Sequence, residues 1–179
     1  MLKPETSILV IVDVQGRLAT LMWNKDAFLE NVVRMIRGAK VLEIPILWNE
    51  QLPDKLGSTV SPVREALTGL EPLVKNTFSC CGNLAFMKAL RESRRTQVLL
   101  VGMESHVCVY QTAMDLLQSR YEVHVVADAV SSRTAENRHI GIDKINDAGG
   151  KITSVETALF EMLRVAEGEN FKRVIQIVK

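Results

Sequence analysis

The sequence predicts an α/β protein with a three-layer, doubly wound (Rossmann-like), mostly parallel six-stranded sheet and helices on both faces. Strand-like and helix-like segments alternate about six times along the chain, which favours βαβ units joined by right-handed crossovers. The strand-like segments are continuous apolar runs, typical of strands covered on both faces. No Pro/Gly-rich linker or internal repeat divides the 179 residues. We therefore expect residues 1–179 to form a single domain.

The first part of the chain contains two predicted strands and one long helix. Residues 7–14, SILVIVDV, are a strand-sized apolar run. A helix is expected over 27–43, where apolar residues recur at helical spacing, with Asp26 as its cap. Residues 44–49, IPILWN, are the second strand. The next stretch, 50–72, contains three prolines and two glycines, so we expect loops around one short helix.

The second part continues the same alternation. Strands are expected over 72–78, 96–103 and 121–130. Helices are expected over 83–93, after Cys108, and over 134–150, where a glycine pair stops the last of them. The segment KITSVETALFEML (151–163) completes the pattern with a short strand and a helix.

Composition and charge argue against several classes of function. There are 22 basic and 21 acidic side chains and no block of like charge, so neither a nucleic-acid partner nor a membrane surface is expected. No apolar run approaches the ~18 residues of a membrane span, and the N-terminus does not resemble a signal peptide, which favours a cytoplasmic protein. The spacing of the three cysteines and three histidines fits no metal or disulfide framework. We expect no metal and no other cofactor.

Three chemically useful side chains lie at the ends of predicted strands. Asp13 ends the first strand, Lys75 ends the third, and Cys108 follows the fourth where a helix should begin. Because the carboxyl ends of parallel strands share one edge of the sheet, we expect these side chains to share a pocket. The helix start and Lys75 are expected to lower the pKa of the thiol below about 8.5. Asp13 would accept its proton and pass it to a leaving amine, and N–H groups of the strand-to-helix turn would face an oxyanion.

The segments VIVDVQ, LVKNTFS, LLVGMESHVCV and VVADAVSSRT resemble, in this order, the isochorismatase-like cysteine hydrolases, a family that includes nicotinamidases and N-carbamoylsarcosine amidase. The resemblance covers nearly the whole chain. It implies that Asp13 is the general base and acid, that Lys75 supports the thiolate, and that Cys108 is the nucleophile. It also implies a cis Met103–Glu104 peptide bond, an oxyanion hole made by the backbone N–H groups of Glu104 and Cys108, and a homo-oligomer.

The chain departs from two branches of that family. Nicotinamidases carry an Asp and two His metal ligands after the second strand, whereas WNEQLPDKLGSTV has no histidine, so a zinc or manganese site is not expected. True isochorismatases, which cleave a vinyl ether, lack the nucleophilic cysteine. Cys108 therefore favours hydrolysis of a small amide or related C–N acyl substrate without a metal.

Each candidate residue also has a plain structural explanation. Cys108 could be a core residue, Asp13 a turn cap and Lys75 a solvated loop residue. Arg133 could bind an anionic substrate group or, as we favour, hold a loop through an ion pair. Several of the residues expected to shape the substrate pocket could equally serve packing or subunit contacts. The residues expected to shape the pocket are Gln15, Trp48, Gln51, Phe78, Ser105 and His106.

Two other functions remain open from the sequence. One is isochorismatase-like ether hydrolysis by acid/base chemistry from Asp13 alone. The other is a non-catalytic module that binds a small molecule on the same fold, because fold alone does not determine function. A dinucleotide is a poor candidate ligand, since the loop after the first strand, DVQGRLAT, has no G-x-G-x-x-G pattern.

Overall fold

The computed structural model describes all 179 residues and confirms the predicted fold class. Its strands are β1 (Ser7–Val12), β2 (Ile46–Gln51), β3 (Leu73–Lys75), β4 (Gln97–Met103), β5 (Glu122–Ser131) and β6 (Lys151–Thr153). They form one sheet in the order β3-β2-β1-β4-β5-β6, and every pair is parallel. The chain winds outward from β1 to β3 and then returns to place β4 beside β1. The switch point, where such folds place their ligands, therefore lies between β1 and β4.

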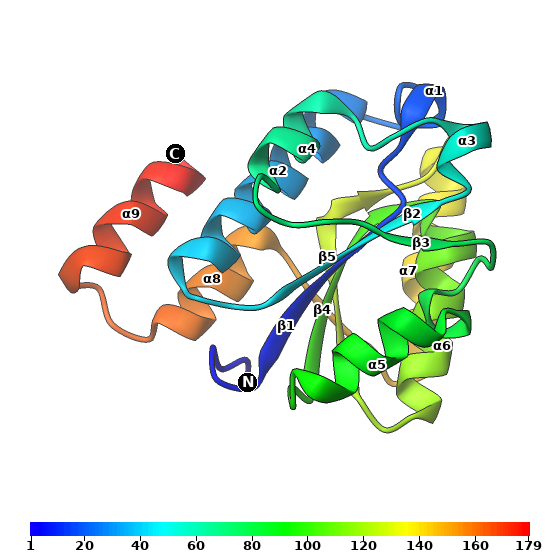
Figure 1. The fold of residues 1–179 in the computed structure, drawn as a ribbon. Helices are drawn as coiled ribbons and strands as arrows, with labels where there is room; N and C mark the ends of the chain where they lie inside the picture. Colours follow the sequence, from blue (N-terminus) through cyan, green and yellow to red (C-terminus); the bar gives the residue numbers. More distant parts are fainter.

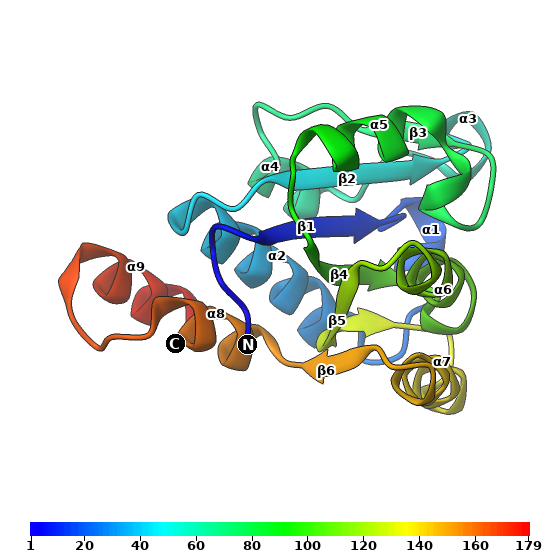
Figure 2. The same ribbon diagram turned by 90° about the horizontal axis from the view of Figure 1, so that it is seen from below.

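Helices cover both faces of the sheet (Figure 1). One face carries α2 (Lys25–Val41), α8 (Val155–Leu163) and α9 (Gly168–Val178), and the other carries α5 (Leu84–Glu92), α6 (Tyr110–Gln118) and α7 (Ala135–Asp147). The short helices are α1 (Gly16–Ala19), α3 (Pro53–Leu56) and α4 (Ser61–Ala66). Figure 2 shows the strands pointing the same way, with α1 and α3 beyond the heads of β1 and β2. These helices thus border the carboxyl edge of the sheet.

The sheet separates two apolar cores, and β1 contributes to both. Leu9 and Ile11 pack among the residues of α2 and α8, whereas Ile8, Val10 and Val12 pack with those of α5 and α6. All six residues of β1 are buried. This explains why the strand reads as a continuous apolar run rather than as an alternation.

Several boundaries differ from those the sequence predicts. Helix α2 begins at Lys25 with Asn24 at its N-cap, so Asp26 lies in the first turn, where its charge still favours the helix dipole. Two short helices, α3 and α4, occupy the region expected to contain one. Helix α9 follows the last predicted element and buries Val174. None of the helices combines the length and apolar character that a membrane span requires.

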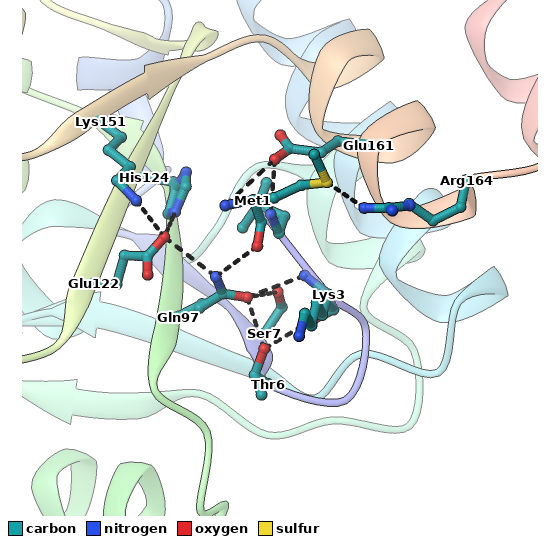
Figure 3. Close-up of polar contacts among 11 residues, drawn as sticks. Met1, Lys3, Thr6, Ser7, Gln97, Glu122, His124, Lys151, Glu161 and Arg164 are labelled. Atoms are coloured by element: carbon teal, nitrogen blue, oxygen red, sulfur yellow. Dashed lines mark hydrogen bonds and ion pairs between the residues drawn. The ribbon is translucent and has the colours of Figure 1, made fainter.

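A polar network lies at the amino end of the central strands (Figure 3). The Glu122 carboxylate accepts hydrogen bonds from Lys151 Nζ at 2.7 Å and Gln97 Nε2 at 3.2 Å, and lies 2.7 Å from His124 Nε2. Gln97 also donates to the carbonyl of Met1 at 3.0 Å. The network ties the starts of β4, β5 and β6 to the beginning of the chain. Its charged groups are satisfied by one another and lie at the opposite end of the strands from Asp13 and Lys75.

Candidate active site

The structure brings the three predicted catalytic side chains together at the carboxyl edge. Asp13 directly follows β1, Lys75 is the last residue of β3, and Cys108 lies in a π-helical turn, Ser105–Val109, after β4. Lys75 Nζ donates to Asp13 Oδ2 at 2.6 Å. Besides burial, the negative charge of the same carboxylate acts on the thiol of Cys108 and raises its pKa. Because β2 separates β3 from β1, the long lysine side chain is needed to reach across the end of that strand.

Lys75 is buried with a full set of acceptors. Besides Asp13, its ammonium donates to the backbone carbonyls of Thr77 at 2.9 Å and Phe78 at 3.0 Å. The side chain is wholly inaccessible to solvent. Since an ammonium has three protons to donate, these contacts satisfy it. Lys75 is therefore not the solvated loop lysine that the sequence left open.

The loop that supplies these carbonyls is held against α6. Ser79 Oγ donates to Asp115 Oδ2 at 2.6 Å, and the backbone N–H of Cys80 donates to Thr112 Oγ1 at 3.0 Å. Both acceptors belong to the helix that follows Cys108. Helix α6 thus helps to position both the two loop carbonyls that accept from Lys75 and the thiol of Cys108.

Asp13 presents one unoccupied carboxylate oxygen. Oδ2 is used by Lys75, whereas Oδ1 is buried and has no hydrogen-bond partner. Burial raises the pKa of this carboxyl above its usual value, although the Lys75 ammonium acts in the opposite direction. The residue also adopts a left-handed backbone conformation, with φ of 53°, which is uncommon outside glycine but which aspartate adopts more readily than most residues. A carboxylate with a raised pKa and a free oxygen is suited to accept a proton.

The electrostatics of Cys108 contradict one prediction. Burial, and then the negative charge of Asp13, raise the pKa of the thiol to about 12, and the opposing effect of Lys75 is smaller. The sequence predicted a lowered pKa. The difference arises because the lysine charge is already matched by Asp13 and the thiol is only 5% exposed. The resting cysteine is a neutral thiol, with Sγ 3.6 Å from Gln51 Oε1.

The turn between β4 and Cys108 also differs from expectation. Every peptide bond is trans, so the predicted cis Met103–Glu104 bond is wrong. The chain instead changes direction at Glu104, which is left-handed with φ of 58° and ψ of 63°. The carbonyl of Glu104 accepts from Val107 N at 2.8 Å, whereas its own N–H donates to no backbone carbonyl. That N–H remains free for an oxyanion.

Close packing holds this turn in place. A Cβ added to Gly141 of α7 would lie 2.4 Å from the carbonyl carbon and oxygen of Ser105. A Cβ added to Gly102, whose φ is +137°, would lie 2.2 Å from the carbonyl oxygen of Val12. Only glycine allows either approach. One contact therefore fixes the turn that carries Cys108 against α7, and the other fixes the end of β4, from which the turn starts, against β1.

A cavity of about 650 Å³ opens above the thiol. Four residues predicted for the site line it: Gln51, Phe78, Glu104 and Cys108. The lining residues that the sequence did not single out are Leu18, Leu52, Lys55, Leu56, Asn76 and Val107. Most of them lie in or beside α1 and α3. The sequence predicted only loops around one short helix over 50–72, and composition does not say which side chains of a loop turn inward.

Four other predicted pocket residues lie outside this lining and have structural roles. Trp48 is buried in the core and donates from Nε1 to Thr59 Oγ1 at 2.8 Å. Gln15 is buried and pairs with the backbone of Gln51, accepting from its N–H at 2.6 Å and donating to its carbonyl at 3.2 Å. Ser105 donates to a backbone carbonyl of β5 at 3.0 Å. Gln15 therefore acts on the cavity through the backbone segments that it holds, and its own side chain does not line the cavity.

His106, the fourth of these residues, joins an ion-pair network beside the cavity. Its Nδ1 lies 3.0 Å from Ser132 Oγ and its Nε2 lies 3.6 Å from Glu104 Oε2. Arg133 contacts both carboxylate oxygens of Glu104, at 3.3 Å and 3.4 Å. The favoured explanation of Arg133 as a loop-holding ion pair is confirmed. No group of three or more His, Cys, Asp or Glu side chains is arranged to hold a metal ion.

Sequence comparisons identify relatives over almost the whole chain. The family model of the isochorismatase domain matches residues 7–157. The secreted isochorismatase effector Isc1 of Phytophthora sojae (strain P6497) is 36% identical over 181 residues, which cover 98% of this chain and 86% of the relative. The isochorismatase domain-containing protein 2A of Mus musculus is 33% identical over 177 residues, covering 98% and 84%.

Solved structures share the fold. The MAR1 ribonuclease of Caenorhabditis elegans superposes with a TM-score of 0.92 at 34% identity, covering 99% of this chain and 91% of that one. YcaC of Escherichia coli, described as an octameric hydrolase of unknown specificity, also superposes with a TM-score of 0.92, at 20% identity and with coverage of 98% and 88%. At that identity the second likeness concerns the fold alone.

Proposed function

The chain belongs to the isochorismatase family, and we propose that it is a cysteine hydrolase of this family that cleaves a small amide or related C–N acyl compound. The proposed catalytic residues are Asp13, Lys75 and Cys108. The observation that carries the proposal is the buried Lys75–Asp13 pair at 2.6 Å, which leaves Asp13 Oδ1 without a partner next to a thiol that borders an open cavity. A solely structural ion pair needs neither the free oxygen nor the cavity.

In the first half of the reaction, Asp13 acts as the base. As Sγ of Cys108 forms a bond to the carbonyl carbon, the thiol proton moves to Asp13, and the carbonyl oxygen becomes an oxyanion. The N–H groups of Glu104 and Cys108 would stabilise this oxyanion. Collapse of the intermediate breaks the C–N bond, and protonated Asp13 gives its proton to the leaving amine. A thioester remains on Cys108.

In the second half, Asp13 takes a proton from water as the water oxygen attacks the thioester. The C–S bond then breaks, the carboxylic acid leaves, and Asp13 returns the proton to Sγ. The raised pKa of Asp13 strengthens it as a base for a thiol of high pKa. Lys75 takes no proton in this scheme; its role is to hold the carboxylate in place and to keep it ionised between the two halves.

The test is ammonia release from a panel of small amides by the wild-type protein and by Cys108→Ala. We expect turnover by the wild type to be unaffected by a chelator and to be lost in the variant. Cys81→Ala is the matched control, because Cys81 is half-buried and does not line the cavity. Activity that is abolished by chelation but survives in Cys108→Ala would overturn the proposal.

The same variants separate the two alternatives. Ether hydrolysis by Asp13 alone requires Cys108→Ala to stay active while Asp13→Asn is inactive. A binding module requires that the wild type hydrolyse neither amides nor ethers while still binding small molecules in the cavity. The cavity does not favour RNA, the substrate suggested by the name of the C. elegans protein, because six of its eleven lining residues are apolar.

Location and assembly also remain proposals. We propose a cytoplasmic protein, although the P. sojae relative is named a secreted effector. We also propose self-association, in keeping with the description of E. coli YcaC as an octamer. Light scattering on the purified protein, with a mass several times that of one 20.0 kDa chain, would support an oligomer.

A further inference from the structure

The charges around the cavity suggest which substrates it accepts. We propose that the cavity selects acyl compounds that carry a carboxylate on a short apolar body, and that Lys55 is the residue that binds this carboxylate. The reaction at Cys108 rests on the proposed function, but the charge preference is a binding property that is measurable without turnover.

Lys55 is the unmatched charge on the lining. The deeper charges, Asp13 and Lys75, neutralise each other at 2.6 Å. The Glu104 carboxylate is matched by Arg133 through two contacts. Lys55 takes part in no ion pair, and its acidic neighbour in sequence does not line the cavity. The cavity therefore carries one net positive charge.

Lys55 is borne by a short helix with a defined position. Gln15 Nε2 donates to the carbonyl of Gly57 at 2.7 Å, directly after α3. A Cβ added to Gly16 would lie 1.9 Å from the carbonyl oxygen of Leu56, so α1 and α3 are in close backbone contact. The Lys55 backbone is thus held at the cavity, and only the side chain must be ordered when an anion binds.

Arg133 provides a second donor at the same lining. Its contacts with Glu104 use Nε and Nη2, and neither uses Nη1. The side chain is 55% exposed. The Arg133 guanidinium therefore keeps a free donor for an anion bound in the cavity, and the charge of Glu104 is already compensated.

The remaining walls suit an apolar body. Besides these cations and the thiol, the cavity is lined by five aliphatic or aromatic side chains: Leu18, Leu52, Leu56, Phe78 and Val107. Mostly apolar walls with a few polar groups are typical of small-molecule sites, where the polar groups set orientation. A substrate held in this way places its scissile carbonyl at Cys108 and its carboxylate at Lys55.

The test compares two ligands of the same shape, benzoate and benzamide, by calorimetric titration of the Cys108→Ser protein, in which neither is turned over. We expect benzoate to bind more tightly than benzamide. Lys55→Gln is expected to weaken benzoate binding by about three- to tenfold and to leave benzamide binding unchanged, and Lys55→Arg to restore it. Lys88→Gln on α5 is the control, because it removes the same charge from an exposed site outside the cavity.

Equal binding of the two ligands, binding of neither, or the same loss in Lys55→Gln and Lys88→Gln would each overturn the inference. Turnover by the otherwise wild-type protein separates it from the proposed function. If benzoate binding depends on Lys55 but no amide is hydrolysed, the hydrolase proposal fails and the charge preference stands. If neutral amides and amides with a terminal carboxylate are hydrolysed equally well with or without Lys55, the charge preference fails alone.

Discussion

Lys75 and Asp13 are 62 residues apart in the chain, yet Lys75 Nζ donates to Asp13 Oδ2 at 2.6 Å, with side chains that are 0% and 5% exposed. Removing two charges from water costs free energy that their mutual attraction only partly returns. Each member of such a pair then depends on the other, because either charge left alone would be buried without compensation. This dependence links the stability of the protein to its proposed chemistry.

Replacing Lys75 by methionine is expected to destabilise the protein by about 3–5 kcal/mol at neutral pH, the usual cost of breaking a buried pair. Without the ammonium, the pKa of Asp13 rises further above that of the unfolded chain, so the folded state binds more protons than the unfolded state. The loss of unfolding free energy caused by the substitution should therefore be larger at pH 8 than at pH 5. Urea unfolding at both values measures this, and the double variant Asp13→Asn/Lys75→Met should recover part of the loss. If the stability lost in Lys75→Met were the same at both pH values, the result would contradict a dependence on the ionisation of Asp13.

The wild-type thiol should behave as an acid with a pKa of about 12. Because the thiolate is the species that reacts, the rate of Cys108 alkylation by iodoacetamide should rise about tenfold per pH unit between pH 7 and pH 10, without levelling off near 9. Peptide mass spectrometry identifies which cysteine is modified. A plateau below pH 9 would mean that Lys75 outweighs burial and Asp13.

Asp13→Asn should separate thiol reactivity from turnover. The change removes a negative charge that raises the pKa of the thiol and leaves the Lys75 cation beside it, so alkylation of Cys108 at pH 8 should become faster. Hydrolysis should fall by about 10²–10⁴-fold, because the proton acceptor is lost. Asp143→Asn, on the exposed face of α7, should change neither rate. Parallel loss of both rates, in a folded protein, would argue against the assigned roles.

Gly141→Ala should disturb the turn that carries Cys108. The added methyl would lie 2.4 Å from the Ser105 carbonyl group, so the turn or α7 must shift. Overpacking of this kind costs about 1–3 kcal/mol, against the gain that alanine usually brings to a helix. We expect a lower unfolding midpoint together with lower hydrolysis. Asn146→Ala, exposed on the same helix, is the control; a stabilised, fully active Gly141→Ala would contradict the close contact.

Acid should weaken the network at the other edge of the sheet (Figure 3). Hydrogen bonds, of which the one from Lys151 has the largest effect, lower the pKa of Glu122 to about 2. Burial lowers the pKa of His124. At both sites the unfolded chain binds more protons than the folded one as the pH falls from 6.5 towards 2, so stability should decrease over that range. In Glu122→Gln, the deficit in melting temperature relative to the wild type should be largest above pH 4.5 and should shrink at pH 3.

The control for the melting temperatures of Glu122→Gln at different pH values is Glu71→Gln, which removes the charge of an exposed glutamate that forms no ion pair. Its melting temperature should follow that of the wild type at every pH. If Glu71→Gln and Glu122→Gln behaved alike, the acid sensitivity would reflect net charge rather than the network.

Local sequence was sufficient for the fold and for the neighbourhood of the site. The apolar run before Asp13 is long enough for a strand and has no polar face, which requires cover on both sides and hence a parallel sheet. In a parallel sheet all carboxyl ends meet at one edge, so Asp13, Lys75 and Cys108 could be placed together before any contact was known. The same local signals did not resolve short elements such as α3, whose few residues carry no clear period.

By itself, then, the sequence determined the layers, the edge and the three side chains, because these depend on local hydrophobic patterns that neighbouring residues carry. Only the tertiary structure decided the trans turn at Glu104, the place of Lys55 on the cavity lining and the burial of Trp48 away from the cavity. It also decided the direction of the Cys108 pKa, through the depth of the thiol and its position relative to two opposite charges from distant strands. Such quantities depend on contacts between residues far apart in the chain, and no local pattern records them.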